Sequence, residues 1–225
     1  MSLDLIYFKA CPFAQRTLIA LGHLGLEFSK TLINPMDKPS WMFAVSPSGQ
    51  VPLLKVDEQE VLFDSSVICE YLNDTAQGNL LLGDALQRAK QRCLVEFGGE
   101  CQMAFAGLLA APNEEKFNQV KTGLLKKLAW LEAQVDENGP LFAGSQLSMV
   151  DIAFAPLFLR LQHLQKVVPI FTDNDLPKIS RWSMAVLEQK AVQESVEGDF
   201  SMIFKMVVGS RGKDGFVHKQ MNQEK

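Results

Sequence analysis

The stretch that decides the fold is LDLIYFKACPFAQRTLIALGHLG, residues 3–25. Residues 3–8 are largely apolar on both sides, which is typical of a strand buried on two faces. Pro12 suits the first turn of a helix, where the N–H that proline lacks would have no partner. Gly25 suits the end of that helix. A second strand is expected over 28–33, so the chain is predicted to begin with a parallel strand–helix–strand unit.

Outward from this unit, the next segment is punctuated by turns. Residues 34–50 contain three prolines and predict a loop. Strands are expected over 51–56 and 61–63, and the short polar link at 57–60 predicts that they pair as a hairpin. Asp64 then suits the N-cap of a further helix.

Beyond residue 76 every apolar pattern has the period of a helix. One stripe joins Leu86, Ala89, Cys93, Phe97, Cys101, Ala104 and Leu108, and a second joins Phe117, Val120, Leu124, Leu128, Leu131 and Val135. Ser148 and Asp151 form a capping box at the start of a third helix. A further helix is expected over 177–190.

These patterns predict an α/β domain followed by an all-helical domain. The α/β domain is expected over 1–75 and the helical domain over 84–208. Residues 209–225 are polar and contain glycine, and we expect a flexible tail there.

Composition narrows the class of protein. The 225 residues are 47% hydrophobic and carry a net charge of −4, which excludes general disorder and argues against nucleic acid as a partner. No apolar run of about 18 residues predicts a membrane span. Four cysteines without zinc or CxxC spacing, and no secretory signal, predict free thiols in the cytoplasm and no metal site.

Cys11 is the sharpest candidate for chemistry. It follows a strand and precedes a helix, where free N–H groups and the helix dipole favour the thiolate, so we expect a lowered pKa. Position 14 is alanine, which excludes a CxxC disulfide, so a mixed disulfide on Cys11 needs an external thiol to resolve it. His23 lies about 18 Å further along the same helix and cannot serve Cys11 as a base. Cys69, Cys93 and Cys101 lie on apolar stripes and are expected in the core.

Five further residues each allow a structural and a functional interpretation. The Val51–Pro52 bond can be cis or trans, and a bend there would leave the backbone of Val51 free to pair with an extended peptide. Asp64 and Ser65 either cap their helix or hold the ammonium and carboxylate of an amino acid. Lys38 either pairs with a carboxylate or is solvated.

Four motifs in this order resemble the omega class of cytosolic glutathione transferases. They are CPFAQR at 11–16, KPSW at 38–41, SPSGQVP at 46–52 and DSS at 64–66. The box at 148–151 is similar to the folding motif of that family's helical domain. The resemblance implies an N-terminal thioredoxin-like domain, an all-helical C-terminal domain and a homodimer.

The resemblance also implies roles for the site residues. Cys11 would form a mixed disulfide with glutathione, which is a co-substrate, and no resident cofactor is implied. The remaining residues would hold the tripeptide: Phe13 beside it, Lys38 at its glycyl carboxylate, Val51 ahead of a cis Pro52 at its cysteinyl backbone, and Asp64 and Ser65 at its γ-glutamyl end. Asp64 stands where the class commonly has glutamate.

The activity expected from this resemblance is that of a glutathione-dependent thiol transferase or dehydroascorbate reductase. Its second substrate would be a glutathionylated disulfide or a small electrophile, and conjugation, isomerisation or dehalogenation are alternatives. Chloride intracellular channel proteins share a similar Cys-Pro-Phe motif, but residues 13–21 are too short and polar to span a membrane, so no stable insertion is expected. A regulatory binding protein, similar to transferase-like starvation proteins that bind RNA polymerase, is the third reading.

Overall fold

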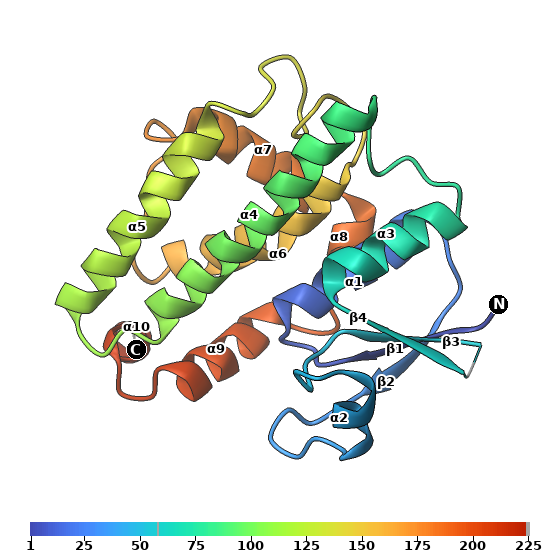
Figure 1. The fold of residues 1–225 in the computed structure, drawn as a ribbon. Helices are drawn as coiled ribbons and strands as arrows, with labels where there is room; N and C mark the ends of the chain where they lie inside the picture. Colours follow the sequence, from blue (N-terminus) through green and yellow to red (C-terminus); the bar gives the residue numbers. More distant parts are fainter. Residues whose placement is uncertain (58, 224–225) are drawn as a thin grey trace.

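The N-terminal part of the computed structural model, which describes residues 1–57 and 59–223, is a four-stranded mixed sheet with helices on both faces (Figure 1). The strands are β1 (Leu3–Tyr7), β2 (Ser29–Leu32), β3 (Leu53–Val56) and β4 (Glu60–Phe63). Their order in the sheet is β2-β1-β3-β4. β1 and β2 are parallel, and β3 is antiparallel to both β1 and β4, as the strand–helix–strand unit and the hairpin predict. The predicted link at 57–60 includes Glu58, which lies outside the described residues.

The two faces of this sheet are covered by different helices. Leu5 and Leu54 are cross-strand partners whose side chains join the core formed with α1 (Pro12–His23) and α3 (Ser65–Thr75). Their neighbours Ile6 and Leu53 point the other way, because side chains alternate along a strand, and pack against Met42 of α2 (Trp41–Val45). β1 is therefore buried on both faces of the sheet, and it leads directly into the turn that precedes α1.

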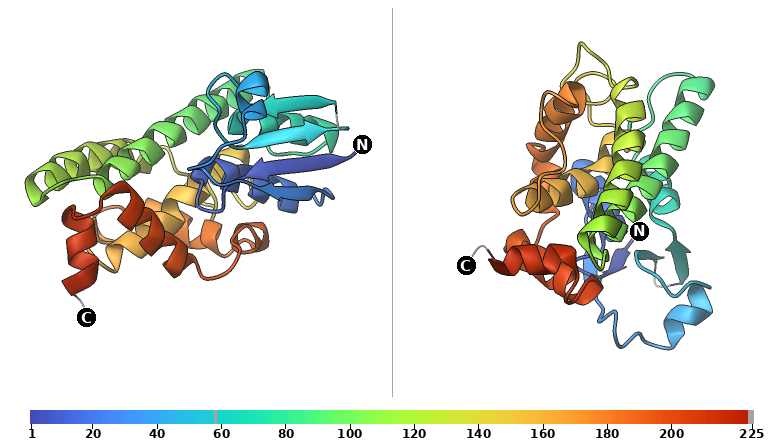
Figure 2. Two further views of the ribbon diagram at one scale, coloured as in Figure 1. Left: turned by 90° about the horizontal axis from the view of Figure 1, so that it is seen from below. Right: turned by 90° about the vertical axis from the view of Figure 1, so that its left-hand side faces the viewer.

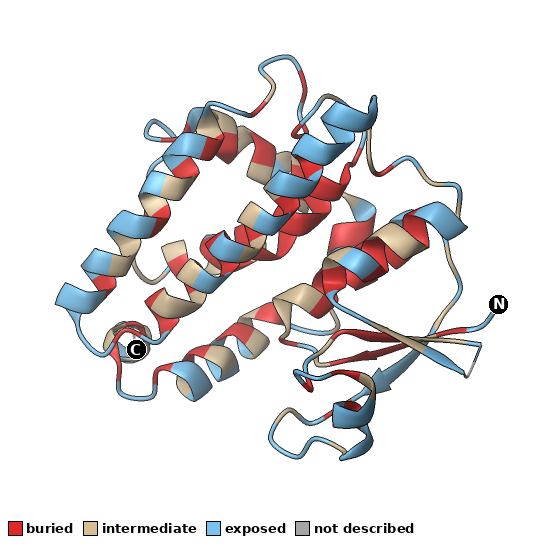
Figure 3. Cartoon of the chain, viewed as in Figure 1, coloured by how far each residue is buried: buried red, intermediate tan, exposed pale blue. Residues whose placement is uncertain are grey.

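The remaining chain is all helical. Its elements are α4 (Ala85–Leu109), α5 (Glu114–Glu132), α6 (Met149–Gln165), α7 (Pro177–Leu187), α8 (Lys190–Glu194), α9 (Phe200–Arg211) and α10 (Phe216–Gln223). Figure 3 shows that α6 is buried over most of its surface, whereas α5 is buried on one side. α6 packs on α4, α7 and α1, so it links the helices to the α/β part. The predicted mixed α/β domain followed by an all-helical domain is confirmed.

The predicted capping box explains how α6 begins. Ser148 accepts from the backbone N–H of Asp151, and Asp151 accepts from the Ser148 N–H at 2.8 Å. The buried Asp151 carboxylate also accepts from the indole of Trp182 at 2.6 Å and from the Phe142 N–H at 2.9 Å. Burial raises the pKa of Asp151 and these hydrogen bonds oppose that rise. The box therefore connects the start of α6 to Trp182 of α7 and to the loop that precedes α6.

The structure corrects the stripe predicted on α4. Leu86, Ala89 and Cys93 are exposed, and the buried positions of the first half of α4 include Gln91 and Val95. The helix packs on α6 with a face rotated from the most apolar one, because the contact with α6 and not hydrophobicity alone selects the buried side. The prediction that Cys93 belongs to the core is therefore wrong, whereas Cys69 and Cys101 are buried as expected.

The C-terminal residues also differ from the expected tail. Residues 209–211 complete α9, and α10 follows with Val217 buried. Phe216 contacts Phe117 of α5, with ring centroids 4.8 Å apart, and its N–H bonds Ala111. These apolar contacts explain the helix, and residues 224–225 lie outside the described part. The first strand, β1, and the last helix, α10, lie on opposite sides of the molecule (Figures 1 and 2). Among the described helices, none is long and apolar enough to cross a bilayer.

Candidate active site around Cys11

Cys11 lies where the sequence predicts it, at the N-cap of α1, and it is half-buried. Its backbone N–H bonds the carbonyl of Phe8 at 2.9 Å, which closes the turn after β1. Its thiol donates to the carbonyl of Val51, with 3.6 Å between sulfur and oxygen. Two motifs that are 40 residues apart are thus brought together at the sulfur.

The electrostatics of Cys11 differ from the expectation. Burial raises the pKa of the Cys11 thiol, and this effect exceeds the opposing effects of the backbone N–H groups of Ala14 and Phe13 and of the charges on Arg160 and Arg211. The predicted lowering of the pKa is therefore wrong for the structure described. A helix N-terminus lowers the pKa of a thiol and desolvation raises it, and at Cys11 desolvation is the larger effect.

The Val51–Pro52 peptide bond is cis. Pro52 is buried directly before β3, and Val51 is half-buried with its carbonyl at the Cys11 thiol. Lys38 lies on the neighbouring loop, where its ammonium donates to the carbonyl of Gly49 at 2.9 Å. The structure therefore ties Lys38 to the segment that leads into Val51, and Val51 contacts Cys11.

Phe13 is half-buried in the first turn of α1. The guanidinium of Arg16 lies over its ring, 5.0 Å from the centroid. Gly99 of α4 is close enough that an added Cβ would lie 3.9 Å from the Phe13 ring, and one added at Gly98 would lie 3.1 Å from Phe154. The glycine pair in α4 therefore lies where α4 packs against α1 and α6.

Asp64 and the residues after it form the other end of the candidate site. Asp64 is exposed and has a left-handed backbone with φ of 72°, a conformation that costs non-glycine residues about 1–3 kcal/mol. Its carboxylate accepts from the N–H of Ser66 at 2.9 Å and from the Ser66 hydroxyl at 2.7 Å. Ser65 is buried. Glu96 of α4 also accepts from the Ser66 hydroxyl, at 3.2 Å, so the helical domain contributes a second carboxylate here.

Sequence reasoning assigned no role to Ser66 or Gln15, although both lie in the quoted motifs, and it did not find Glu96 or Arg160. Glu96 is 30 residues from Ser66, and no local pattern indicates that contact. Gln15 and Arg160 are buried and hydrogen-bonded to each other across 145 residues. The only available signal was the presence of polar side chains in apolar helices.

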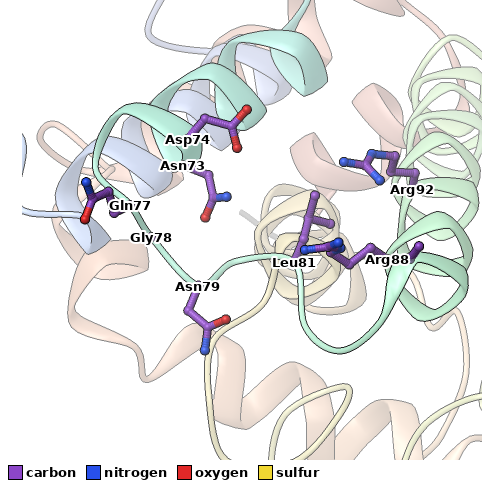
Figure 4. Close-up of a pocket in the computed structure, with 9 residues that line it drawn as sticks. Asn73, Asp74, Gln77, Gly78, Asn79, Leu81, Arg88 and Arg92 are labelled. Atoms are coloured by element: carbon purple, nitrogen blue, oxygen red, sulfur yellow. The ribbon is translucent and has the colours of Figure 1, made fainter.

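Figure 4 shows a surface hollow that does not belong to this site. It lies between the C-terminal end of α3 and the start of α4, and it is lined by polar side chains such as Asn73, Asp74, Arg88 and Arg92. It lies at the opposite end of α3 from Asp64. Because Arg92 already pairs with Glu70 at 2.8 Å, the hollow contains little that points to chemistry.

Comparison with known proteins identifies both parts of the chain. Residues 10–75 match the model of the glutathione S-transferase N-terminal domain, and residues 98–190 match that of the C-terminal domain. Glutathione S-transferase omega-1 of Sus scrofa is 33% identical over 82% of this chain and 76% of its own length. The probable glutathione S-transferase DHAR4 of Arabidopsis thaliana is 30% identical over 75% of this chain and 74% of its own.

Solved structures agree with these matches. Glutathione transferase Omega 3C from Trametes versicolor superimposes with a TM-score of 0.78 at 25% identity, covering 88% of this chain and 90% of that one. The tau-class enzyme from Mangifera indica has the same fold, with a TM-score of 0.82 at 18% identity over 94% of this chain and 99% of its own. The resemblance seen in the four motifs is thus confirmed, and the chain belongs to the glutathione S-transferase family of enzymes.

Proposed function

We propose that this protein is a glutathione-dependent thiol transferase and reductase in which Cys11 is the nucleophile. The observation that carries the proposal is the position of the Cys11 thiol, half-buried at the start of α1 and in contact with the Val51 carbonyl. The omega and DHAR relatives support this activity over the channel-like and regulatory readings. Glutathione is a co-substrate, and no resident cofactor is proposed.

The chemistry proceeds by thiol–disulfide exchange. The Cys11 thiolate attacks the glutathione sulfur of a glutathionylated substrate, the substrate's S–S bond breaks, and the substrate leaves as a thiolate that takes up a proton. A second glutathione thiolate then attacks the mixed disulfide on Cys11. Oxidised glutathione is released and Cys11 returns as the thiolate. The mixed disulfide of the substrate has then been reduced at the expense of one free glutathione thiol, because the other half of the oxidised glutathione came from the substrate.

The first step requires a deprotonated sulfur. Because burial raises the pKa of Cys11, most of the sulfur is protonated at neutral pH, and its proton is donated to Val51. An extended peptide that pairs with the backbone of Val51 competes for this carbonyl acceptor. Binding of glutathione at Val51 would therefore remove a hydrogen bond that stabilises the neutral thiol.

We assign the binding roles as follows. Val51, ahead of Pro52, pairs with the cysteinyl unit of glutathione, and Phe13 lies beside it. Lys38 exchanges its bond to Gly49 for the glycyl carboxylate. The carboxylate of Asp64 holds the γ-glutamyl ammonium, and the start of α3 at Ser65 holds the α-carboxylate, since a helix N-terminus offers free N–H donors.

The assembly and location belong to the same proposal. Large apolar side chains are exposed on β4, α3, α4 and α5, namely Phe63, Val67, Met103 and Trp130. They support a homodimer, because covering them would remove apolar surface from water. The four free cysteines support a reducing compartment such as the cytoplasm.

The test is intact mass spectrometry after incubation with oxidised glutathione. We expect a gain of about 305 Da on Cys11, which reduced glutathione removes. Cys93→Ser is the matched control, because Cys93 is an exposed thiol outside the site, and this variant should gain the same mass. A gain that persists in Cys11→Ser and disappears in Cys93→Ser would refute the proposal.

A further inference from the structure

Arg160 is a buried cation without a carboxylate partner. It lies on α6 and is 5% exposed. Its guanidinium donates only to neutral oxygens: the Gln15 side chain at 2.7 Å, the Pro156 carbonyl at 2.8 Å and the Ala10 carbonyl at 3.0 Å. Within residues 1–57 and 59–223, no ion pair involves it. Burying a charge without an oppositely charged partner is energetically costly. A buried, unpaired arginine therefore suggests a role beyond stability.

The contacts of Arg160 converge on the segment that carries the nucleophile. Ala10 directly precedes Cys11, and Gln15 lies in the first turns of α1. The ring of Phe200 on α9 covers the guanidinium, 5.3 Å from its centroid. One side chain of the helical domain thus connects α6, α9 and the start of α1.

The charge of Arg160 and the sulfur of Cys11 affect each other. Burial lowers the pKa of Arg160 to about 10, and the charge of the Cys11 thiolate opposes this. In return, the charge of Arg160 lowers the pKa of Cys11, against the effect of burial. The thiolate is therefore an anion that this buried cation can stabilise without direct contact.

Two other arginines influence Cys11 in different surroundings. Arg211 at the end of α9 is exposed, so solvent screens its charge. Arg16 of α1 is buried and donates to the Ala153 carbonyl at 3.1 Å, but the nearby charges of Asp64 and Glu96 share its influence. Arg160 alone of the three has both a buried charge and a hydrogen bond to the residue before Cys11.

We propose that Arg160 is the positioning residue of the nucleophile: it fixes the Ala10–Cys11 segment and supplies the buried positive charge that stabilises the Cys11 thiolate. The α/β part carries the nucleophile, and the helical domain carries the cation that activates it. This inference rests on the proposed role of Cys11. It adds that the reactivity of Cys11 depends on the docking of α6 against α1.

The test is the pH dependence of Cys11 in the full chain. Alkylation by iodoacetamide is followed by intact mass, and thiolate absorbance near 240 nm is measured against Cys11→Ser. In Arg160→Met we expect the midpoint of both curves to move to higher pH by about one unit, with alkylation at pH 7 about tenfold slower. Arg160→Lys retains the positive charge but lacks the planar set of N–H donors of the guanidinium, so we expect an intermediate shift of the midpoint.

Ser195→Ala is the matched structural control. It removes a neutral hydrogen bond across the same contact, from Gln15 to Ser195 at 3.1 Å, and leaves every charge in place. We expect its Cys11 midpoint to equal that of the wild type. Circular dichroism and thermal melting establish that each variant is folded, and Arg160→Lys supplies the comparison if Arg160→Met does not fold.

Equal midpoints in the wild type and in a folded Arg160 variant would overturn the inference, as would an equal shift in Ser195→Ala. Failure of the proposed function is a separate result. It would appear as wild-type protein that takes up no glutathione on Cys11, whatever the alkylation curves show.

Discussion

Cys11 and Cys69 both belong to the α/β part of the molecule, and burial raises the pKa of both thiols. Cys69 lies on α3 at 2% exposure, and its pKa rises to about 12. Cys11 is half-buried, with backbone N–H groups and Arg160 acting against the rise. An arginine also opposes the rise at Cys69, so desolvation and a compensating charge are common to both thiols. The comparison teaches that the candidate nucleophile differs from the core thiol in its access to solvent and in the backbone N–H groups at the start of α1.

The largest effect on activity is expected from replacing Cys11, and a much smaller one from replacing Cys69. Cys11→Ser should lower glutathione-dependent disulfide reduction by at least about a thousandfold, because serine forms no mixed disulfide. Cys69→Ala should keep most of the activity and lose some stability. Steady-state reduction of a glutathionylated peptide measures both. Comparable activity in Cys11→Ser would break the comparison.

The second effect concerns stability at alkaline pH. A thiol whose pKa is raised by folding stabilises the fold fully below its unfolded pKa, and this contribution is lost as pH rises toward the folded value. For Cys69, with a pKa of about 12, the loss falls between about pH 9 and 12 and reaches at most about 4 kcal/mol. Urea unfolding at several pH values measures it. Cys69→Ala should flatten this pH dependence, and an unchanged slope would contradict the assigned burial effect.

A smaller effect separates binding from activation. The charge of Asp64 raises the pKa of Cys69 and is not among the main influences on Cys11. In the proposed site the carboxylate of Asp64 holds the γ-glutamyl ammonium. Asp64→Asn should weaken glutathione binding by about tenfold, through loss of this charge-assisted contact. Calorimetry measures the affinity. The alkylation curve of Cys11 should stay within about 0.2 pH units of the wild type, and a larger shift would show that the two ends of the site are coupled.

The smallest effect is expected at Lys38. Its ammonium is exposed and bonds the Gly49 carbonyl, so Lys38→Met removes a screened charge from the glycyl end of the tripeptide. We expect the KM for glutathione to rise by about threefold with kcat unchanged. Steady-state kinetics with varied glutathione check this. A fall in kcat with KM constant would place Lys38 in the chemical step.

Local patterns were sufficient for the elements that carry the site. Pro12 after a buried strand predicted the start of α1, the polar link predicted the β3–β4 hairpin, and the Ser148–Asp151 box predicted the start of α6. Each of these signals acts over a few residues, through a missing N–H, a turn or a reciprocal cap. The four motifs similar to omega-class transferases then predicted the family.

The failures have the opposite character. The exposed half of α4, the helix α10 in place of a tail, and the contact of Glu96 with Ser66 depend on which face of a helix meets a distant neighbour. The prediction that the pKa of Cys11 is lowered was wrong for the same reason. The dipole of α1 can be predicted from its own residues, but the desolvation of its N-terminal end depends on how distant segments pack against it.

Local sequence was therefore enough to name Cys11 as the candidate nucleophile and to place it at the start of a helix, since strand, cysteine and proline are adjacent and their geometry is local. Only the tertiary structure decided the environment of that sulfur: its acceptor at Val51, its buried neighbour Arg160 and the net direction of its pKa. Desolvation and buried charge depend on all the atoms around the sulfur, and these come from distant segments, such as Arg160, which bonds Ala10 across 150 residues.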